Sequence, residues 1–332
     1  MATNAESQVS GWLESVSDEE MKFCWLEQTL CTAYGRTSEG QMVGEEREKV
    51  WHTTTGNKQF PGKKTPVVTC MKGNVGLLPN QDNFSVAYLK NGWTLACCAD
   101  GHGVYGHMVS SRLVQNLLYA LAHRLQPCEE TAFPAAIEAA FEFAEKDLIA
   151  HASKFGWECE ASGASVVLAV YKGNTVYTAH CGDCRCVIGL EHTGELAFAT
   201  QDHKPDVIKE QARIQASGGE VRSEIYPDGW VVHRVFAEGK DFPGLCKSRT
   251  IGDLIAKNYG VIGVPDVSVT EVKLGCKPFM VLASDGIWEF VDSEFVVKAI
   301  AKIISSDGPT RTRLDSYGDD DDSCFAELWL SD

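Results

Sequence analysis

The sequence lacks the features that direct a chain into or across a membrane. No apolar run approaches the roughly 20 residues that a transmembrane helix needs. The N-terminus, MATNAESQVSGWLESV, has no basic stretch followed by an apolar core, and alanine stands second where a myristoylation motif has glycine. We therefore expect no membrane insertion and a location in the cytoplasm or the nucleus.

Positive charge is also scarce. The chain has 30 lysines and arginines against 46 aspartates and glutamates, which gives a formal net charge of -16. It contains no block of about five or more basic residues. Such a surface repels polyanions, so we expect no nucleic-acid partner. Internal repeats and low-complexity linkers are absent too, which leaves one large domain or two ordinary ones for 332 residues.

Cysteine is abundant, with 13 residues at irregular spacing. An odd number without a secretory signal favours free thiols in a reducing compartment. The densest group is AHCGDCRCVIG, which could be a zinc site, a redox centre or a simple turn. Apolar strands flank Gly182-Asp183, so this dipeptide is predicted to be the tip of a β-hairpin. Strand alternation would then place the three cysteines on one face and His180 on the other, a poor geometry for a four-ligand metal site.

The remaining pattern predicts an α+β protein with mainly antiparallel sheets. The β-branched runs 67–73, 83–100, 165–183 and 185–190 are broken by the hairpin signals YLKNGWTL and VYKGNTVY. Apolar residues at helical spacing predict helices over 108–125 and 132–152, and further helices are expected over 205–218 and 292–308. Strands, two helices and then more strands favour α+β over a doubly wound parallel sheet.

Residues 1–65 are predicted to form a helical and extended segment that precedes the main domain, residues 66–332. A helix is expected over 17–34, with Ser17 as its N-cap and Glu20 completing a capping box. Residues 36–64 are polar and turn-rich. The segment either packs on the core of the main domain or binds a partner.

Two apolar strands end on an Asp-Gly step. TLACCADGHG ends on Asp100, and FMVLASDGIWEF ends on Asp285. An exposed carboxylate beside open glycine backbone offers the oxygen ligands that hard cations prefer, although either step alone could be a solvated turn. His102 could move protons near neutral pH. The two Asp-Gly steps follow the same pattern, an apolar strand that ends on an aspartate. Together with Asp82 before a strand and the acidic run 319–322, they favour carboxylates that converge on a pair of cations.

Ten motifs in this order resemble those of the metal-dependent serine/threonine protein phosphatases of type 2C. They lie between about residue 67 and residue 330, and they are NQDNF, ADGHG, SGASVV, HCGDCRCVIG, QDHKP, ARIQASGGEV, LCKSRTIGD, VPDVSV, LASDGIWEFV and DDDSCF. The resemblance implies two antiparallel sheets packed face to face with helix pairs outside each, a four-layer αββα sandwich. It also implies phosphoprotein substrates, and a flap over about 202–249 that helps to choose among them.

The resemblance further implies a role for each acid. The expected metal-ligand set consists of Asp82, Asp100, the carbonyl of Gly101, Asp285 and Asp321. Asp100 would bridge two Mg²⁺ or Mn²⁺ ions, and a hydroxide between them would attack phosphoserine or phosphothreonine, with His102 as general acid. A third, weaker ion would be held by Asp183 and Glu289.

The sequence also departs from the family pattern. Leu77 stands where an arginine usually grips the phosphate, and Lys72 is the nearest upstream cation that could replace it. Gln81 replaces a glutamate, Glu289 an aspartate and Ser165 a threonine. The lost arginine leaves an alternative open, in which the chain is a catalytically impaired regulator or scaffold of the same fold. A zinc or redox protein built on the cysteines is the third interpretation.

Overall fold

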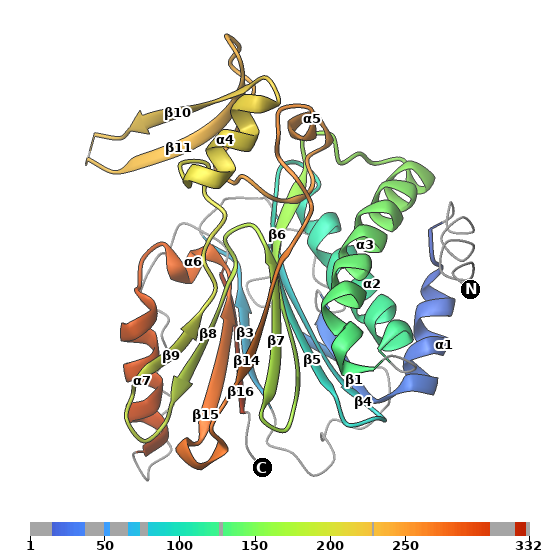
Figure 1. The fold of residues 1–332 in the computed structure, drawn as a ribbon. Helices are drawn as coiled ribbons and strands as arrows, with labels where there is room; N and C mark the ends of the chain where they lie inside the picture. The colour runs from blue at the N-terminus through green and yellow to red at the C-terminus, as the bar shows by residue number, and fades with distance from the viewer. Residues whose placement is uncertain are drawn as a thin grey trace.

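The computed structural model describes residues 15–36, 50–53, 66–73, 79–125, 129–227, 229–305 and 323–329. Two antiparallel sheets face each other, and helices cover their outer faces (Figure 1). The α+β class with antiparallel sheets is therefore confirmed. Within the described ranges, no helix is long and apolar enough to cross a membrane.

The larger sheet has eight strands in the order β14-β7-β6-β5-β4-β1-β2, with β13 paired to β6. Its strands are β1 (Thr29–Arg36), β2 (Val50–Thr53), β4 (Asp82–Leu89), β5 (Thr94–His102), β6 (Gly163–Lys172), β7 (Thr175–Cys181), β13 (Ile251–Gly252) and β14 (Asp266–Glu271). Both predicted hairpins are present, because β4 pairs with β5 and β6 pairs with β7. Their turns contain Gly92 and Gly173 at positive φ, which a residue with a side chain rarely adopts.

The second sheet has five strands in the order β3-β16-β15-β8-β9. Its strands are β3 (Val67–Met71), β8 (Arg185–Leu190), β9 (Leu196–Ala199), β15 (Pro278–Ala283) and β16 (Ser323–Trp329). The predicted final strand is thus β16, which lies between β3 and β15. Apolar side chains of both sheets form one buried cluster between them, and its members include Phe84, Val167, Ile188 and Met280.

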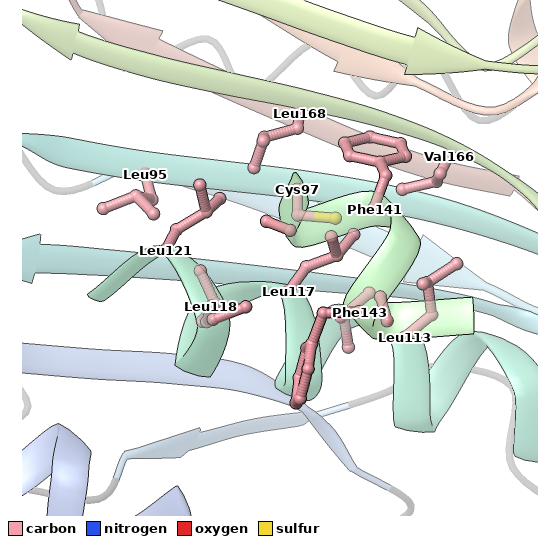
Figure 2. Packing of buried hydrophobic residues seen from close by; sticks show 14 of the residues in the cluster. Leu95, Cys97, Leu113, Leu117, Leu118, Leu121, Phe141, Phe143, Val166 and Leu168 are labelled. Atoms are coloured by element: carbon pink, nitrogen blue, oxygen red, sulfur yellow. The ribbon is translucent and has the colours of Figure 1, made fainter. Parts of the chain in front are cut away.

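Seven α-helices and two short 3-10 helices occur in the described ranges. They are α1 (Asp18–Gln28), α2 (Gly106–Arg124), α3 (Phe133–Phe155), α4 (Ile208–Ala216), α5 (Leu254–Lys257), α6 (Asp285–Trp288), α7 (Ser293–Ser305), η2 (Glu130–Ala132) and η3 (Leu274–Cys276). Helices α2 and α3 pack Leu117 and Phe141 against Leu95 and Leu168 of the larger sheet (Figure 2). Helix α7 covers the outer face of the five-stranded sheet through residues such as Val297 and Ile300.

The N-terminal helix is shorter than predicted. The capping box is present, since the Glu20 amide donates to Ser17 Oγ at 3.2 Å and the Ser17 amide donates to Glu20 Oε2 at 2.8 Å. The helix ends at Gln28, however, and the β-branched Thr29 starts strand β1, which pairs with β4. Sheet pairing thus overrides the helical pattern that extended the prediction to residue 34. The boundary at residue 65 stays a prediction.

The predicted hairpin at Gly182-Asp183 is wrong. Strand β7 pairs with β6 and β14, whereas β8 pairs with β15 and β9, so this turn crosses from one sheet to the other. Turn chemistry makes the chain reverse but does not decide which strands pair. Consequently Cys181 packs under the helices while Cys184 and Cys186 pack between the sheets, and the predicted common face of the three cysteines is wrong as well.

A small three-stranded sheet with helix α4 projects from one end of the sandwich (Figure 1). Its strands are β10 (Gly219–Ile225), β11 (Val231–Ala237) and β12 (Pro243–Leu245), in the order β10-β11-β12. Helix α4 ends near Gly218, which has φ of +76° as expected for a helix C-cap. We call residues 205–246, which lie within the region 202–249 predicted as a flap, the flap.

Candidate metal centre

The acids of the candidate site come from the ends of central strands and from the crossover. Asp82 begins β4 and lies opposite Asp100 of β5 in the sheet register. Asp285 follows β15 and is the first residue of α6. Asp183 lies in the crossover between the two sheets. The β4–β5 hairpin, the crossover and the end of β15 therefore deliver carboxylates to one end of the sandwich.

Three of these carboxylates form a compact group. One oxygen each of Asp100, Asp183 and Asp285 lies within 4.8 Å of the other two. Asp183 is fully buried, whereas the side chain of Asp285 is 25% exposed, so the group is open to solvent at Asp285. A purely oxygen donor set of this kind is the one that hard divalent cations prefer.

A lysine side chain lies among these carboxylates. Lys247 Nζ is 3.0 Å from Asp100 Oδ2, 3.5 Å from Asp183 Oδ1 and 3.5 Å from Asp285 Oδ2. The residue is 5% exposed. Burial alone would lower the pKa of Lys247, but the three carboxylates outweigh it and hold the pKa well above its usual value. The ammonium therefore stays charged at the centre of the group.

A second lysine reaches the same group. Lys204 Nζ lies 2.5 Å from Asp183 Oδ2, and Ser165 Oγ donates to Asp183 Oδ1 at 2.8 Å. Burial would raise the pKa of Asp183, but Lys247 and Lys204 reverse the effect and hold it below its usual value. By contrast, burial and then the charge of Asp100 raise the pKa of Asp285 well above normal. The group thus combines a firmly ionised Asp183 with an Asp285 that resists ionisation.

The turn that carries Asp183 requires glycine on its N-terminal side. Gly182 has φ of +111°, and a Cβ at this position would lie 2.2 Å from the Cβ of Ser165. Gly101 is equally constrained, since a Cβ there would lie 2.2 Å from the carbonyl oxygen of Gly106. The Gly101 amide donates to the Gln81 carbonyl at 3.1 Å, which fixes the backbone next to Asp100.

Asp82 stands beside the compact group and not within it. Its Oδ2 accepts a hydrogen bond of 2.6 Å from the hydroxyl of Ser284, the residue before Asp285. Because Ser284 belongs to the β15–α6 junction, this bond ties the start of β4 to the second sheet. The structure therefore gives Asp82 a contact that aligns two of the strands that carry the site.

His102 makes an ion-pair contact at the end of β5. Its Nε2 lies 2.7 Å from Asp253 Oδ2, and its side chain is 24% exposed while that of Asp253 is 6% exposed. Burial raises the pKa of Asp253, but the charge and hydrogen bond of His102 prevail and leave it below normal. Asp253 has φ of +50°, and a Cβ on Gly163 would lie 2.2 Å from its Oδ2. This backbone holds the carboxylate where it orients the imidazole.

Arg249 connects the flap to the sandwich. It forms a bidentate ion pair with Glu210 of α4, in which Nη2 donates to Oε1 at 2.7 Å and Nε donates to Oε2 at 3.0 Å. Its Nη1 donates to Asp266 Oδ1 of β14 at 2.8 Å. Burial would raise the pKa of Glu210, but the bonds from Arg249 and Arg213 lower it to about 2. Arg249 therefore positions α4 and is not among the residues that contact the carboxylate group.

A family model described as "Protein phosphatase 2C" matches residues 64–316 of this sequence. The chain belongs to the protein phosphatase 2C family. Among curated relatives, it is 31% identical over 294 residues to "Probable protein phosphatase 2C 64" of Oryza sativa subsp. japonica, an alignment that covers 81% of this chain and 66% of the relative. It is 40% identical over 155 residues to "Probable protein phosphatase 2C 61" of Arabidopsis thaliana, covering 46% of each.

Solved structures of low identity share the fold. A serine-threonine phosphatase 2C from Toxoplasma gondii has a TM-score of 0.61 at 18% identity, covering 82% of this chain and 96% of that one. A C. elegans sex-determining protein has a TM-score of 0.68 at 18% identity, covering 83% and 67%. The alignments with the first curated relatives span from 46% to 66% of those proteins' own lengths.

The structure brings some of the predicted phosphatase 2C site residues together and not others. Asp100, Asp183 and Asp285 meet, while the exposed Glu289 lies outside this group at the end of α6. Asp183 thus belongs to the central group, and its partnership with Glu289 in a third site stays a prediction. Lys72 follows β3, and its role as substitute for the arginine is untested. Asp321 and Leu77 lie outside the described residues.

Sequence reasoning missed Lys247 and Lys204 as part of the site. Both belong to motifs that carry the family resemblance, LCKSRTIGD and QDHKP. The sequence did contain one sign that Lys247 is buried, because its neighbours Cys246 and Ser248 are both small and at most weakly polar. A cation in such a place needs a buried partner, and the sequence offers no local acid within reach.

The three cysteines of the 179–189 stretch do not form a metal site in this structure. Cys181, Cys184 and Cys186 are free thiols with 0% exposure, and they are divided between two cores. Burial raises the pKa of Cys181 and of Cys184 to about 12, so neither is poised to become a thiolate. His180 stacks on His203 with a ring-centre distance of 4.3 Å. These are the contacts of packed core residues.

Proposed function

We propose that this protein is a metal-dependent phosphatase that removes phosphate from phosphoserine and phosphothreonine in proteins. The single observation that carries the proposal is the convergence of Asp100, Asp183 and Asp285 within a phosphatase 2C fold. Mg²⁺ or Mn²⁺ ions held by these residues, and by Asp82, the Gly101 carbonyl and Asp321, would supply an activated water and offset the charge of the phosphate. Such a site can bind an anion although the chain as a whole is acidic.

In this proposal His102 is the general acid for the leaving group. The imidazole is held through Nε2 by Asp253 at 2.7 Å, while its Nδ1 is a buried atom with no hydrogen-bond partner among the described residues. The contact with the Asp253 carboxylate fixes the plane of the imidazole. The serine or threonine alkoxide that leaves would receive a proton from the imidazole.

The test is hydrolysis of 4-nitrophenyl phosphate and of a phosphothreonine peptide, each measured with and without added Mn²⁺. We expect turnover that depends on Mn²⁺ and that disappears in Asp100→Asn. The matched control is Asp18→Asn, because the Asp18 side chain is 74% exposed and lies on α1. Turnover in the wild type no greater than in Asp100→Asn would refute an enzymatic function.

One observation favours a second function, that of a regulatory protein with the same fold and little turnover. Lys247 places a positive charge within 3.5 Å of three carboxylates that would hold the metal. Such a protein would bind phosphorylated partners without releasing phosphate. Mn²⁺ binding by calorimetry together with absent hydrolysis of the phosphopeptide would support this function over the first.

A further inference from the structure

Lys247 Nζ takes the position that a central cation would occupy. The three carboxylate oxygens lie within 4.8 Å of one another, and the ammonium lies between 3.0 and 3.5 Å from one oxygen of each residue. A divalent ion would have to lie within about 2.0–2.6 Å of the same oxygens. Two positive charges that contact the same oxygens lie only a few ångströms apart and repel each other, so binding of one disfavours binding of the other.

The ammonium also neutralises a buried acidic group that would otherwise repel itself. Asp183 is 0% exposed and Asp100 is 8% exposed, and like charges in such surroundings disfavour one another strongly. Lys247 contacts all three carboxylates, while Lys204 contacts Asp183 alone from a side chain that is 38% exposed. Lys247 is therefore the central counter-charge, and Lys204 is an outer one.

The backbone that carries Lys247 is fixed on its C-terminal side. The Ser248 amide donates to the His203 carbonyl at 2.9 Å, and Ser248 Oγ donates to Glu210 Oε2 at 2.9 Å. Arg249 follows with its contact to Glu210. A cation that enters the group would therefore displace the lysine side chain while the backbone on its C-terminal side stays in place.

We propose that Lys247 is a built-in competitor of the metal, which holds the carboxylate group together without an ion and lowers the affinity for Mg²⁺ or Mn²⁺. A ligand that binds only after an internal contact is broken loses the free energy of that contact. The proposal rests on the metal dependence proposed above, but it concerns binding, and its test requires no hydrolysis. A protein that binds Mn²⁺ without turnover would leave it intact.

The test compares Mn²⁺ affinity among lysine variants, by calorimetry and by the electron paramagnetic resonance signal of free Mn²⁺. Lys247→Met keeps the length of the side chain and removes its charge, so we expect its Kd for Mn²⁺ to fall by about tenfold or more. Lys204→Met should show a smaller fall. Lys257→Met is the matched control, since Lys257 pairs with Glu145 at 2.7 Å with 20% exposure, and its Kd should equal that of the wild type.

Two further measurements keep the proposal open to refutation. Lys247→Arg retains the charge and should retain weak Mn²⁺ binding; affinity as high as that of Lys247→Met would show that the charge does not compete. Thermal unfolding in EDTA should show a loss of stability in Lys247→Met that saturating Mn²⁺ restores. An unchanged or weaker Mn²⁺ affinity in Lys247→Met, or failure of this variant to fold even with Mn²⁺, would overturn the proposal.

Discussion

Replacing Asp147 by asparagine should destabilise the fold by breaking a buried ion pair beneath the N-terminal helix. Asp147 of α3 is 3% exposed and accepts bonds from Arg112 Nε at 2.7 Å and Arg112 Nη2 at 2.8 Å. It also accepts from the Val16 amide at 2.8 Å and from Asn116 Nδ2 at 2.9 Å. One carboxylate thus connects α2, α3 and the chain that enters α1.

The expected loss follows from the charge that stays behind. Arg112 is 4% exposed, and removing one partner of a buried pair costs about 3–5 kcal/mol because the other charge is left uncompensated. Asp18 Oδ1 lies 3.4 Å from Arg112 Nη1, but its side chain is 74% exposed and compensates little. Asparagine retains one acceptor oxygen, so we expect the lower end, about 3 kcal/mol.

Equilibrium urea unfolding in EDTA, followed by circular dichroism and by tryptophan fluorescence, measures this loss. Asp18→Asn is the control, and it should cost less than about 1 kcal/mol. The double variant Arg112→Met with Asp147→Leu should recover part of the loss, because it leaves no buried charge unpaired. A loss below about 1 kcal/mol in Asp147→Asn would refute the view that the ion pair anchors the N-terminal helix.

Three further predictions concern the site and its supports. His102→Ala should slow hydrolysis of a phosphothreonine peptide much more than that of 4-nitrophenyl phosphate, because only the poor leaving group needs a proton; equal losses would contradict a general-acid role. Asp285→Ala should abolish Mn²⁺-dependent turnover while circular dichroism in EDTA stays that of the wild type, and a collapsed spectrum would contradict it. Glu210 has a pKa lowered from 4.5 to about 2, so its contribution to stability is present above pH 4.5 and is lost as the pH falls toward 2. Glu210→Gln should therefore flatten the dependence of the urea midpoint on pH in that range, and an unchanged slope would exclude the contribution.

The parts of the fold that local chemistry determines could be predicted. Asn91-Gly92 and Gly173-Asn174 define tight turns between apolar strands, and both hairpins are present. Helix spacing placed α2 and α3 to within a few residues, because each buries one apolar face. The two Asp-Gly steps predicted the meeting of Asp100 and Asp285, since repeated strand-end chemistry reflects a shared geometry.

The parts that depend on tertiary pairing could not be predicted. The dipeptide Gly182-Asp183 has the residues of a hairpin tip, yet its strands join different sheets, and only the partners β6 and β15 decide this. Lys247 lies 147 residues from Asp100 in the sequence, and no motif near Lys247 predicts an acidic partner for it. A buried ion pair of this separation becomes visible only when the strands that carry it have been placed.

The two lysines at the carboxylate group also bracket the flap. Lys204 immediately precedes residues 205–246 and Lys247 immediately follows them, and both ammonium groups contact Asp183. Both ends of the flap are therefore attached to one buried carboxylate that itself lies at the crossover between the two sheets. Because Arg249 adds a separate link from Glu210 to β14, the flap would keep its attachment to the sandwich when Lys247 leaves the group. The charge at the centre of the site and the attachment of the flap are thus built partly from the same residues, Lys204, Lys247 and Asp183.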